Sequence, residues 1–546
     1  MSKDVFIIGI DGGTWDLIDP LISKGKLPHL SKLVKNGVRG PLRSTLLPIT
    51  PVAWTTFATG KNPDKHGIFD FSHRKEGTYE PVPYSSSDRQ GDTLWQILSR
   101  AGKKVGVLNM PSTYPVEKVN GFLVSGFPTP EEMGDFTYPS KLLQELRREF
   151  GPEFRFQPRV NAQNEHPFLE EMKVVSEYVF KATDYLMKKY PWDFLVTVFV
   201  GPDALGHVFY KYMDPNHPSY IKNGPDKFKN AVIESYMKID EYISKLLKNV
   251  DKDTTIMFMS DHGFGPLYYG VSINNWLMDN GFLKLRTNYG TRFRYWMFNR
   301  GVNYNNLFKL IKTLRLSKQA FKAAYSKRSR WVDLVNKLFL TDKDIDWSRT
   351  SAYCMGNMGQ LFINLKGREP EGIIDHEGDY NKIVDRFITK LKKLKDPGTG
   401  QVIFDEVYNK TEVYPNSSIK DNTPDVIFND SKFVYSVSRY FEFGSKKLIT
   451  PHPVWSGTHR RNGIFIAYGP DKIRQGVEIK KFSISDITPN VLHVMGVPIP
   501  NDMDGKVSIK LYDKKSKYAT RKPKFQNVEE DKILGQIKAL KKIGKL

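Results

Sequence analysis

Short apolar runs recur along this chain, and helix-like segments separate them. The clearest runs occupy residues 5–10, 104–110, 121–126, 194–200, 255–259, 424–428 and 463–469. Helical patterns mark the segments 26–37, which stops on Gly37, and 168–190. Near-continuous apolar strands that alternate with helices are typical of parallel sheets covered on both faces. The pattern therefore predicts a doubly wound, mostly parallel α/β sheet.

Residues 283–345 break this alternation. Apolar residues recur there at helical spacing, with basic residues between them: Leu307, Leu310, Ile311 and Leu314, with Lys309, Lys312 and Arg315. We expect an α/β core formed by residues 1–282 and 346–512, with a basic helical cap inserted at 283–345. A Lys-rich tail, 513–546, follows, and Ile533, Ile537 and Leu540 fall at helical spacing in it.

Positive charge is concentrated in these two attachments. The chain of 546 residues has a formal net charge of +22. Residues 283–340 hold 14 Lys or Arg against one acid, and the tail holds 11 against four. The rest of the chain is therefore nearly neutral.

Cysteine content and hydropathy limit the class of protein. A single cysteine, Cys354, excludes a disulfide framework and is compatible with a reducing compartment. No run reaches the roughly 18 apolar residues of a membrane span. The first apolar run, interrupted by Asp11, is typical of a core strand and not of a signal peptide. We expect a cytoplasmic protein, with peripheral membrane contact as a further option.

Residues that bind metal ions well lie at the ends of four of these runs. They are Asp11 after 5–10, Asp203 and His207 after 194–200, Asp261 and His262 after 255–259, and His459 just before 463–469. Ligands in open α/β sheets gather at the carboxyl ends of the strands. Six carboxylates and imidazoles there predict one site for two divalent cations. The imidazoles favour zinc or manganese over magnesium.

A candidate nucleophile lies in the segment 47–71. Thr50 stands just before Pro51 and a helix-like stretch, AWTTFATG. A hydroxyl near a helix N-terminus gains backbone N–H donors for an anionic substrate. Metal coordination would make it a competent attacker. Ser44, Thr45 and Thr55 stay open as alternatives, as does a simple turn role for Thr50.

Several motifs stand at these positions: GIDGG at Asp11, T-x8-TG-x2-P-x2-HGI from Thr50 to Ile68, PDALGH from Pro202, SDHGF from Ser260, GTHRRNGIFIAYGP from Gly457 and ISDITPNVLHVMGVPIPNDMDG from Ile484. Together they resemble the type I phosphodiesterase/nucleotide pyrophosphatase family of the alkaline phosphatase superfamily. Each is weak alone, but they occur in the family's order and span residues 4 to 505 apart from the basic insertion.

The resemblance implies a role for each matching position. One metal would be held by Asp203, His207 and His459, and the other by Asp11, Asp261, His262 and the nucleophile Thr50. Thr50 would attack phosphorus, give a phosphothreonyl intermediate and release an alcohol or a phosphate. Water would then hydrolyse the intermediate. The expected activity is metal-dependent cleavage of a phosphodiester or phosphoanhydride bond.

One position departs from the family pattern. Nucleotide-cleaving members usually carry an asparagine three residues after the HGI isoleucine, where it donates to a phosphate oxygen, and here that position is Phe71. We therefore expect a phosphorylated small molecule or a lipid-linked phosphate as substrate. A phosphomonoesterase or phosphomutase on the same scaffold is the nearest alternative. A non-catalytic protein associated with membranes or nucleic acid is the other.

The basic insertion has three interpretations. A solvated face is the ordinary one. Contact of 283–340 and the tail with an anionic membrane is the second, because Tyr295, Trp296 and Phe298 neighbour Arg292, Arg294 and Arg300. Nucleic-acid binding is less favoured, since no known reader motif accompanies the charge.

Three residues near the motifs are expected to have supporting roles. We expect His66 to brace its loop and Trp54 to be a core residue. His452 is expected to be a packing or surface residue, with substrate contact as the alternative.

Overall fold

The computed structural model describes residues 3–130, 134–303, 305–307, 337–376, 378–417, 422–437, 443–452 and 454–528. The helical positions predicted at Leu310, Ile311 and Leu314, and at Ile533, Ile537 and Leu540, lie outside these ranges. Among the described helices, none is long and apolar enough to cross a lipid bilayer.

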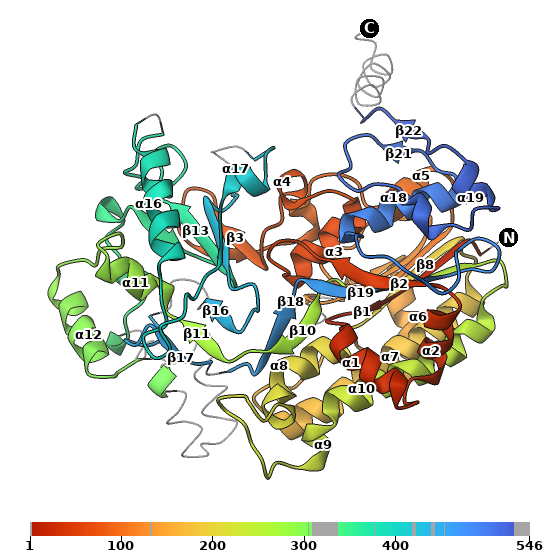
Figure 1. Ribbon diagram of the computed structural model, residues 1–546, viewed down its shortest axis with the longest axis horizontal. Helices are drawn as coiled ribbons and strands as arrows, with labels where there is room; N and C mark the ends of the chain where they lie inside the picture. Colours follow the sequence, from red (N-terminus) through yellow and green to blue (C-terminus); the bar gives the residue numbers. More distant parts are fainter. Residues whose placement is uncertain are drawn as a thin grey trace, which may run out of the picture.

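A nine-stranded sheet forms the centre of the larger lobe (Figure 1). Its strands, in spatial order, are β20 (Val477–Glu478), β2 (Val38–Arg43), β19 (Asn462–Tyr468), β9 (Thr255–Met259), β1 (Val5–Ile10), β8 (Phe194–Phe199), β5 (Val105–Met110), β6 (Gly121–Ser125) and β7 (Thr137–Tyr138). Strands β9, β1, β8, β5 and β6 run parallel, whereas β19 and β7 run antiparallel to their neighbours. The predicted mostly parallel α/β sheet is confirmed.

Helices cover both faces of this sheet, as alternate residues of β1 show. Phe6, Ile8 and Ile10 pack into one core, and Val5 and Ile7 pack into another. The first core includes α1 (Trp15–Ser23), α2 (Pro28–Lys35), α6 (Lys141–Phe150), α7 (Glu165–Lys189), α8 (Gly201–Met213) and α10 (Ala231–Leu246). The second includes α3 (Thr50–Thr59), α5 (Leu94–Arg100) and α18 (Ile487–Met495). Figure 1 shows these two layers on opposite sides of the strands.

A smaller lobe has its own apolar core and two small sheets. One sheet has the order β12 (Ala352–Cys354), β13 (Gly359–Ile363), β15 (Val426–Asn429), β14 (Glu406–Asn409). The other has the order β16 (Tyr435–Val437), β11 (Tyr269–Val271), β17 (Ile449–Pro451). Helices α11 (Ile273–Asp279), α12 (Tyr289–Asn299) and α16 (Tyr380–Lys392) complete it at the left of Figure 1.

Strand β15 corrects one expectation. The run 424–428 was expected to join the parallel sheet, but β15 pairs antiparallel with β13 and β14 in the smaller lobe. An apolar run indicates that a strand is buried, but it does not indicate which sheet contains the strand. Val426 and Phe428 pack in the smaller lobe's core, and Ile427 on the other face packs in a separate apolar cluster with Leu47 and Ile49.

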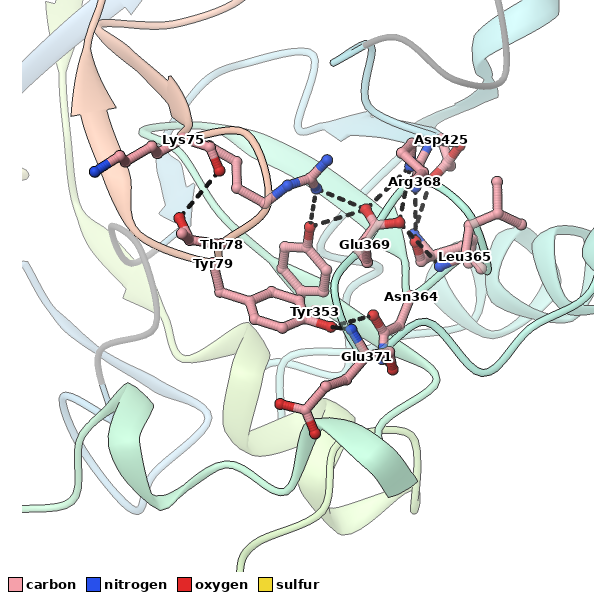
Figure 2. A network of polar contacts seen from close by, with 12 residues as sticks. Lys75, Thr78, Tyr79, Tyr353, Asn364, Leu365, Arg368, Glu369, Glu371 and Asp425 are labelled. Carbon is pink, nitrogen blue, oxygen red and sulfur yellow. Dashed lines mark hydrogen bonds and ion pairs between the residues drawn. The ribbon is translucent and has the colours of Figure 1, made fainter.

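A buried polar network joins the β3 (Ser72–Arg74) and β4 (Pro81–Pro83) hairpin to the smaller lobe (Figure 2). Arg74 Nη1 donates to Glu369 Oε1 at 2.6 Å. Arg368 then links Glu369 to Asp425, with its Nη2 2.6 Å from Asp425 Oδ2. All four side chains are at most 7% exposed, so this network fixes the hairpin that begins just after Phe71.

Candidate metal centre

Three adjacent strands deliver five of the predicted site residues to one edge of the large sheet. Asp11 follows β1, and Asp261 and His262 follow β9, while Asp203 and His207 lie on α8, which begins after β8. The carboxyl ends of these parallel neighbours share one edge, as the sequence pattern predicts. On α8 the spacing of four places both side chains on the same face.

His459 reaches the same edge by a different route. It lies on β18 (Gly457–Arg460), which pairs antiparallel with β10 (Gly263–Pro266) and puts His459 opposite Phe264. Strand β19, which follows, runs antiparallel to β9. The beginning of β19 therefore lies at the edge where the parallel strands end, and this explains why His459 precedes its apolar run.

The carboxylates and imidazoles lie within contact distance of one another. Asp203 Oδ1 is 3.2 Å from His459 Nε2, 3.4 Å from His207 Nε2 and 4.0 Å from His262 Nε2. His262 Nε2 is also 3.1 Å from Asp261 Oδ2 and 3.6 Å from Asp11 Oδ1. Two groups with metal-ligand spacing result, and Asp203 belongs to both: Asp203, His207 and His459, and Asp11, Asp203 and His262.

Each imidazole has its Nδ1 next to a backbone carbonyl. The distances are 2.8 Å from His207 to Gly457 O, 3.0 Å from His262 to Gly263 O and 2.6 Å from His459 to Pro48 O. A carbonyl only accepts, so each Nδ1 carries the proton and donates it. The Nε2 atoms then present lone pairs to the centre, where those of His207 and His459 are 3.1 Å apart. Such second interactions are typical of metal-binding histidines.

Burial shifts the pKa values of four groups in the cluster, Asp11, Asp261, His262 and His459, toward their uncharged forms. The pKa values of Asp11 and Asp261 are raised well above their usual range, first by burial and then by repulsion between carboxylates. Burial lowers the pKa of His262 and of His459. Asp11 Oδ1, Asp203 Oδ1 and Asp261 Oδ2 are buried without a hydrogen-bond donor. Acceptor atoms that face one another in this way fit divalent cations between them.

Thr50 lies beside this cluster. It is the first residue of α3, is buried, and has its Oγ1 3.3 Å from His262 Nε2. The alternatives considered from sequence, Ser44, Thr45 and Thr55, line other cavities. The structure thus brings all seven sequence-predicted site residues together.

Trp54 and His66 have the supporting roles expected from sequence, and Trp54 also contacts a residue of the cluster. Trp54 is 1% exposed, and its Nε1–H donates to Asp11 Oδ2 at 3.0 Å, which orients that carboxylate. His66 is fully buried, with its Nε2 2.9 Å from Thr56 Oγ1. Its Nδ1 accepts from the backbone N–H of Ile68 at 3.1 Å, so His66 braces its loop.

A cavity of about 310 Å³ opens onto the cluster and Thr50. Its wall is largely aromatic and aliphatic, and it comes from both lobes: Phe71, Phe127, Phe156, Phe168, Met172, Leu267, Met358, Val437 and Trp455. Among the described residues that line it, none is a lysine or an arginine. His452 lines it too, in agreement with the substrate-contact alternative. Sequence reasoning missed the apolar wall, because its residues come from α7, from β16 and from several loops, and no single spacing relates them all.

An amide from the smaller lobe also lines this cavity, near the position where the family pattern expects asparagine. Asn357 donates its backbone N–H to Asp70 Oδ2 at 2.7 Å and its Nδ2–H to Asp70 Oδ1 at 2.5 Å. Gly356 has φ 117°, and a Cβ there would lie 2.6 Å from Asp70 Oδ2. Glycine therefore lets this loop close around Asp70, next to Phe71.

Comparison with known proteins identifies the family. The family model described as "Type I phosphodiesterase / nucleotide pyrophosphatase" matches residues 5–449. The chain belongs to this family. The match includes six of the seven cluster residues and ends before His459.

Solved structures share the phosphodiesterase fold. Murine ectonucleotide pyrophosphatase/phosphodiesterase 5 superposes with a TM-score of 0.50 and 13% identity, over 94% of this chain and 100% of that one. The human protein of the same name superposes with a TM-score of 0.48 and 12% identity, over 94% of this chain and 100% of that one. The likeness to the murine structure, with the family match, places the chain in an alkaline phosphatase-like fold. A yeast (Saccharomyces cerevisiae) GPI ethanolamine phosphate transferase 3 is 30% identical over 80 residues, or 15% of this chain and 6% of the transferase.

Proposed function

We propose that this protein hydrolyses phosphodiester or phosphoanhydride bonds with two divalent metal ions and Thr50 as nucleophile. The observation that carries the proposal is the set of buried ligand atoms that face one another without donors. Three carboxylate oxygens and three imidazole Nε2 atoms converge there, beside a buried hydroxyl. Membership of a phosphohydrolase family supports the reaction class.

The residues divide between two cations as the resemblance implies. Asp203, His207 and His459 would hold one, and Asp11, Asp261 and His262 the other, with Asp203 Oδ1 within reach of both groups. The imidazoles favour zinc or manganese. When bound, two such cations neutralise the carboxylates and stabilise the charge on a transferring phosphoryl group.

Thr50 supplies the covalent step. Its Oγ1 forms a bond to phosphorus as the bond to the leaving oxygen breaks, and the Oγ1 proton goes to solvent. The leaving group departs as an alcohol or a phosphate after it takes up a proton from water. Water then attacks phosphorus, and the Thr50 hydroxyl is restored. The N-terminus of α3 supplies backbone N–H groups beside the anionic phosphoryl group, and Asn357 is a further donor in the cavity.

The cavity favours a diester with an apolar organic group. A phosphomonoester carries more negative charge than a diester, and the described lining offers no lysine or arginine to balance it. The aromatic and aliphatic wall suits an apolar alcohol group, such as that of a lipid-linked phosphate, because burying apolar surface is favourable. Phe71, where nucleotide-cleaving members carry a donor, supports the same choice.

Hydrolysis of bis-p-nitrophenyl phosphate and p-nitrophenyl phosphate tests this function. We expect diester cleavage that chelation abolishes and that zinc or manganese restores. Thr50→Ala should lower the turnover by at least about a thousandfold, because the nucleophile is lost. Thr55→Ala is the matched control, since Thr55 is buried on the same helix but lines another cavity, and it should keep wild-type turnover.

Two outcomes would overturn this reading. A preference for the monoester would instead identify a phosphomonoesterase or phosphomutase. Full turnover in Thr50→Ala would remove Thr50 from the mechanism. The same test separates an enzyme from a non-catalytic binding protein, which would hold metal without cleaving either compound.

A further inference from the structure

Helix α12 presents an aromatic face to solvent. Tyr289, Phe293 and Trp296 are 92%, 49% and 48% exposed. Their spacings of four and three residues place them on one side of the helix. With Tyr295, this helix holds four of the ten exposed large hydrophobic side chains among the described residues. Such a concentration marks an interaction surface, because scattered apolar residues need no explanation but a cluster does.

The opposite face of α12 is firmly anchored, so the exposure of these rings is not the fraying of a loose helix. Arg294 points inward and binds the buried Asp344, with Nη2 2.5 Å from Oδ1. Thr291 Oγ1 donates to the same carboxylate at 2.7 Å. Phe298 is 2% exposed and packs in the smaller lobe's core, and the side chain of Asn288 caps the first turn.

The outward face is positively charged. Arg292 and Arg300 flank the aromatic stripe, and Arg292 makes no ion pair with any residue that the structure describes. The Arg300 guanidinium carbon lies 3.8 Å from the centroid of the Trp296 ring. Arg294, in contrast, is neutralised by Asp344. The wider sequence, with 14 basic residues against one acid in 283–340, adds charge of the same sign.

An anionic lipid surface is the partner that fits this face best. Aromatic rings beside arginines suit the boundary between headgroups and acyl chains, where rings bury and cations meet lipid phosphates. Single-stranded nucleic acid would need free ring faces for base stacking. Trp296 stacks on Phe293, with centroids 6.0 Å apart and planes at 21°, and Arg300 also covers it. We propose that α12 docks on an anionic bilayer through Tyr289, Phe293 and Trp296, flanked by Arg292 and Arg300.

Vesicle binding by the full chain tests the docking surface and needs no enzymatic activity. Vesicles of phosphatidylcholine alone are compared with vesicles that contain about one-third phosphatidylglycerol, in a sedimentation assay at low and high salt. The wild type should bind the anionic vesicles and bind the neutral ones much more weakly. The double variant Phe293→Ser/Trp296→Ser should bind at least about tenfold more weakly, and Arg292→Ala about fivefold.

Two exposed positions elsewhere provide matched controls. Met237→Ser removes an apolar side chain that is 39% exposed on α10, and Lys480→Glu reverses an exposed charge on the larger lobe. Both should bind as the wild type does. Equal binding by the wild type and the double variant would overturn the proposal. The proposal would also be overturned if the protein bound an oligonucleotide through the same aromatic residues and did not bind the anionic vesicles.

Tryptophan fluorescence keeps the proposal testable if the double variant does not fold. Trp54, Trp95 and Trp192 are buried, whereas Trp296 is half exposed, so its emission should shift to the blue on anionic vesicles. Trp296→Phe keeps an aromatic ring and should retain most of the binding while it removes most of the shift. An unchanged shift in Trp296→Phe would show that another part of the chain meets the lipid.

Discussion

At the scale of single residues, backbone carbonyls decide which nitrogen each histidine offers. Pro48 O, Gly263 O and Gly457 O hold the Nδ1 atoms, and three Nε2 lone pairs are left facing the carboxylates. The sequence predicted which residues meet at this edge. It did not predict which ring atom faces the centre, because the spacing of residues does not define where the carbonyls of Pro48, Gly263 and Gly457 lie relative to the rings.

His66 makes stability depend on pH in a way that can be measured. Its pKa is lowered from 6.5 to about 3, first by burial and then by Arg89. At pH values between about 3 and 6.5, His66 binds a proton in the unfolded chain but not in the folded chain. Stability therefore rises with pH across this window and falls as the pH drops below about 6.5, by about 1.4 kcal/mol per pH unit.

The variant His66→Gln should remove this contribution. At pH 7.5 we expect it to unfold at a lower temperature than the wild type, because the brace to Thr56 and Ile68 is weakened. The difference in unfolding temperature between the wild type and this variant should narrow as the pH falls to about 5. Thermal unfolding followed by circular dichroism would measure it. His29→Gln, at an exposed position, should keep the pH dependence of the wild type. A constant gap for His66→Gln would contradict the assignment.

At the scale of elements, the network in Figure 2 joins the β3–β4 hairpin to the smaller lobe. Asp425, which is fully buried, accepts from Arg368 and from Tyr380, and Lys410 Nζ lies 3.4 Å away. Burial opposes ionisation of this carboxyl, but the charge of Arg368 outweighs it, so the pKa of Asp425 is lowered. Removal of Asp425 would take from the buried Arg368 and Lys410 the carboxylate that they share.

Asp425→Ala should therefore destabilise the protein by about 3–5 kcal/mol, the usual cost of breaking a buried ion pair from one side. Asp375→Ala provides the control, because Asp375 pairs with Lys366 where both side chains are more than half exposed. That change should cost at most about 1 kcal/mol. Urea denaturation of both variants measures the difference, and equal costs would contradict the role given to the network.

The same scale shows where sequence patterns succeed and fail. The strands β1, β5, β6, β8 and β9 were predicted as members of a mostly parallel sheet, because their apolar runs alternate with helices. Their order in the sheet was not predicted. Helix α7 was predicted at 168–190 and runs from Glu165 to Lys189. The run that forms β15 was assigned to the large sheet, which is wrong. Apolar character does not distinguish a buried strand of the larger lobe from one of the smaller lobe.

At the scale of the whole molecule, the site lies where the two lobes meet. The larger lobe supplies the cluster and Thr50, and the smaller lobe supplies Asn357, Met358 and Val437 to the cavity wall. The cluster was predictable, because its residues lie at strand ends and its chemistry restricts the residue types. The wall was not predictable, because apolar residues carry no chemical signature and their meeting depends on how the lobes pack.

The binding of two metal ions is the central claim, and elemental analysis of the purified protein tests it most directly. After saturation with zinc or manganese and removal of free metal, we expect about two ions per chain for the wild type and Thr50→Ala. Asp203→Ala should lose most of the metal, since Asp203 belongs to both groups of ligands. Circular dichroism would check that this variant is folded. A wild-type chain that retains no metal, or an Asp203→Ala chain that retains both ions, would contradict the account.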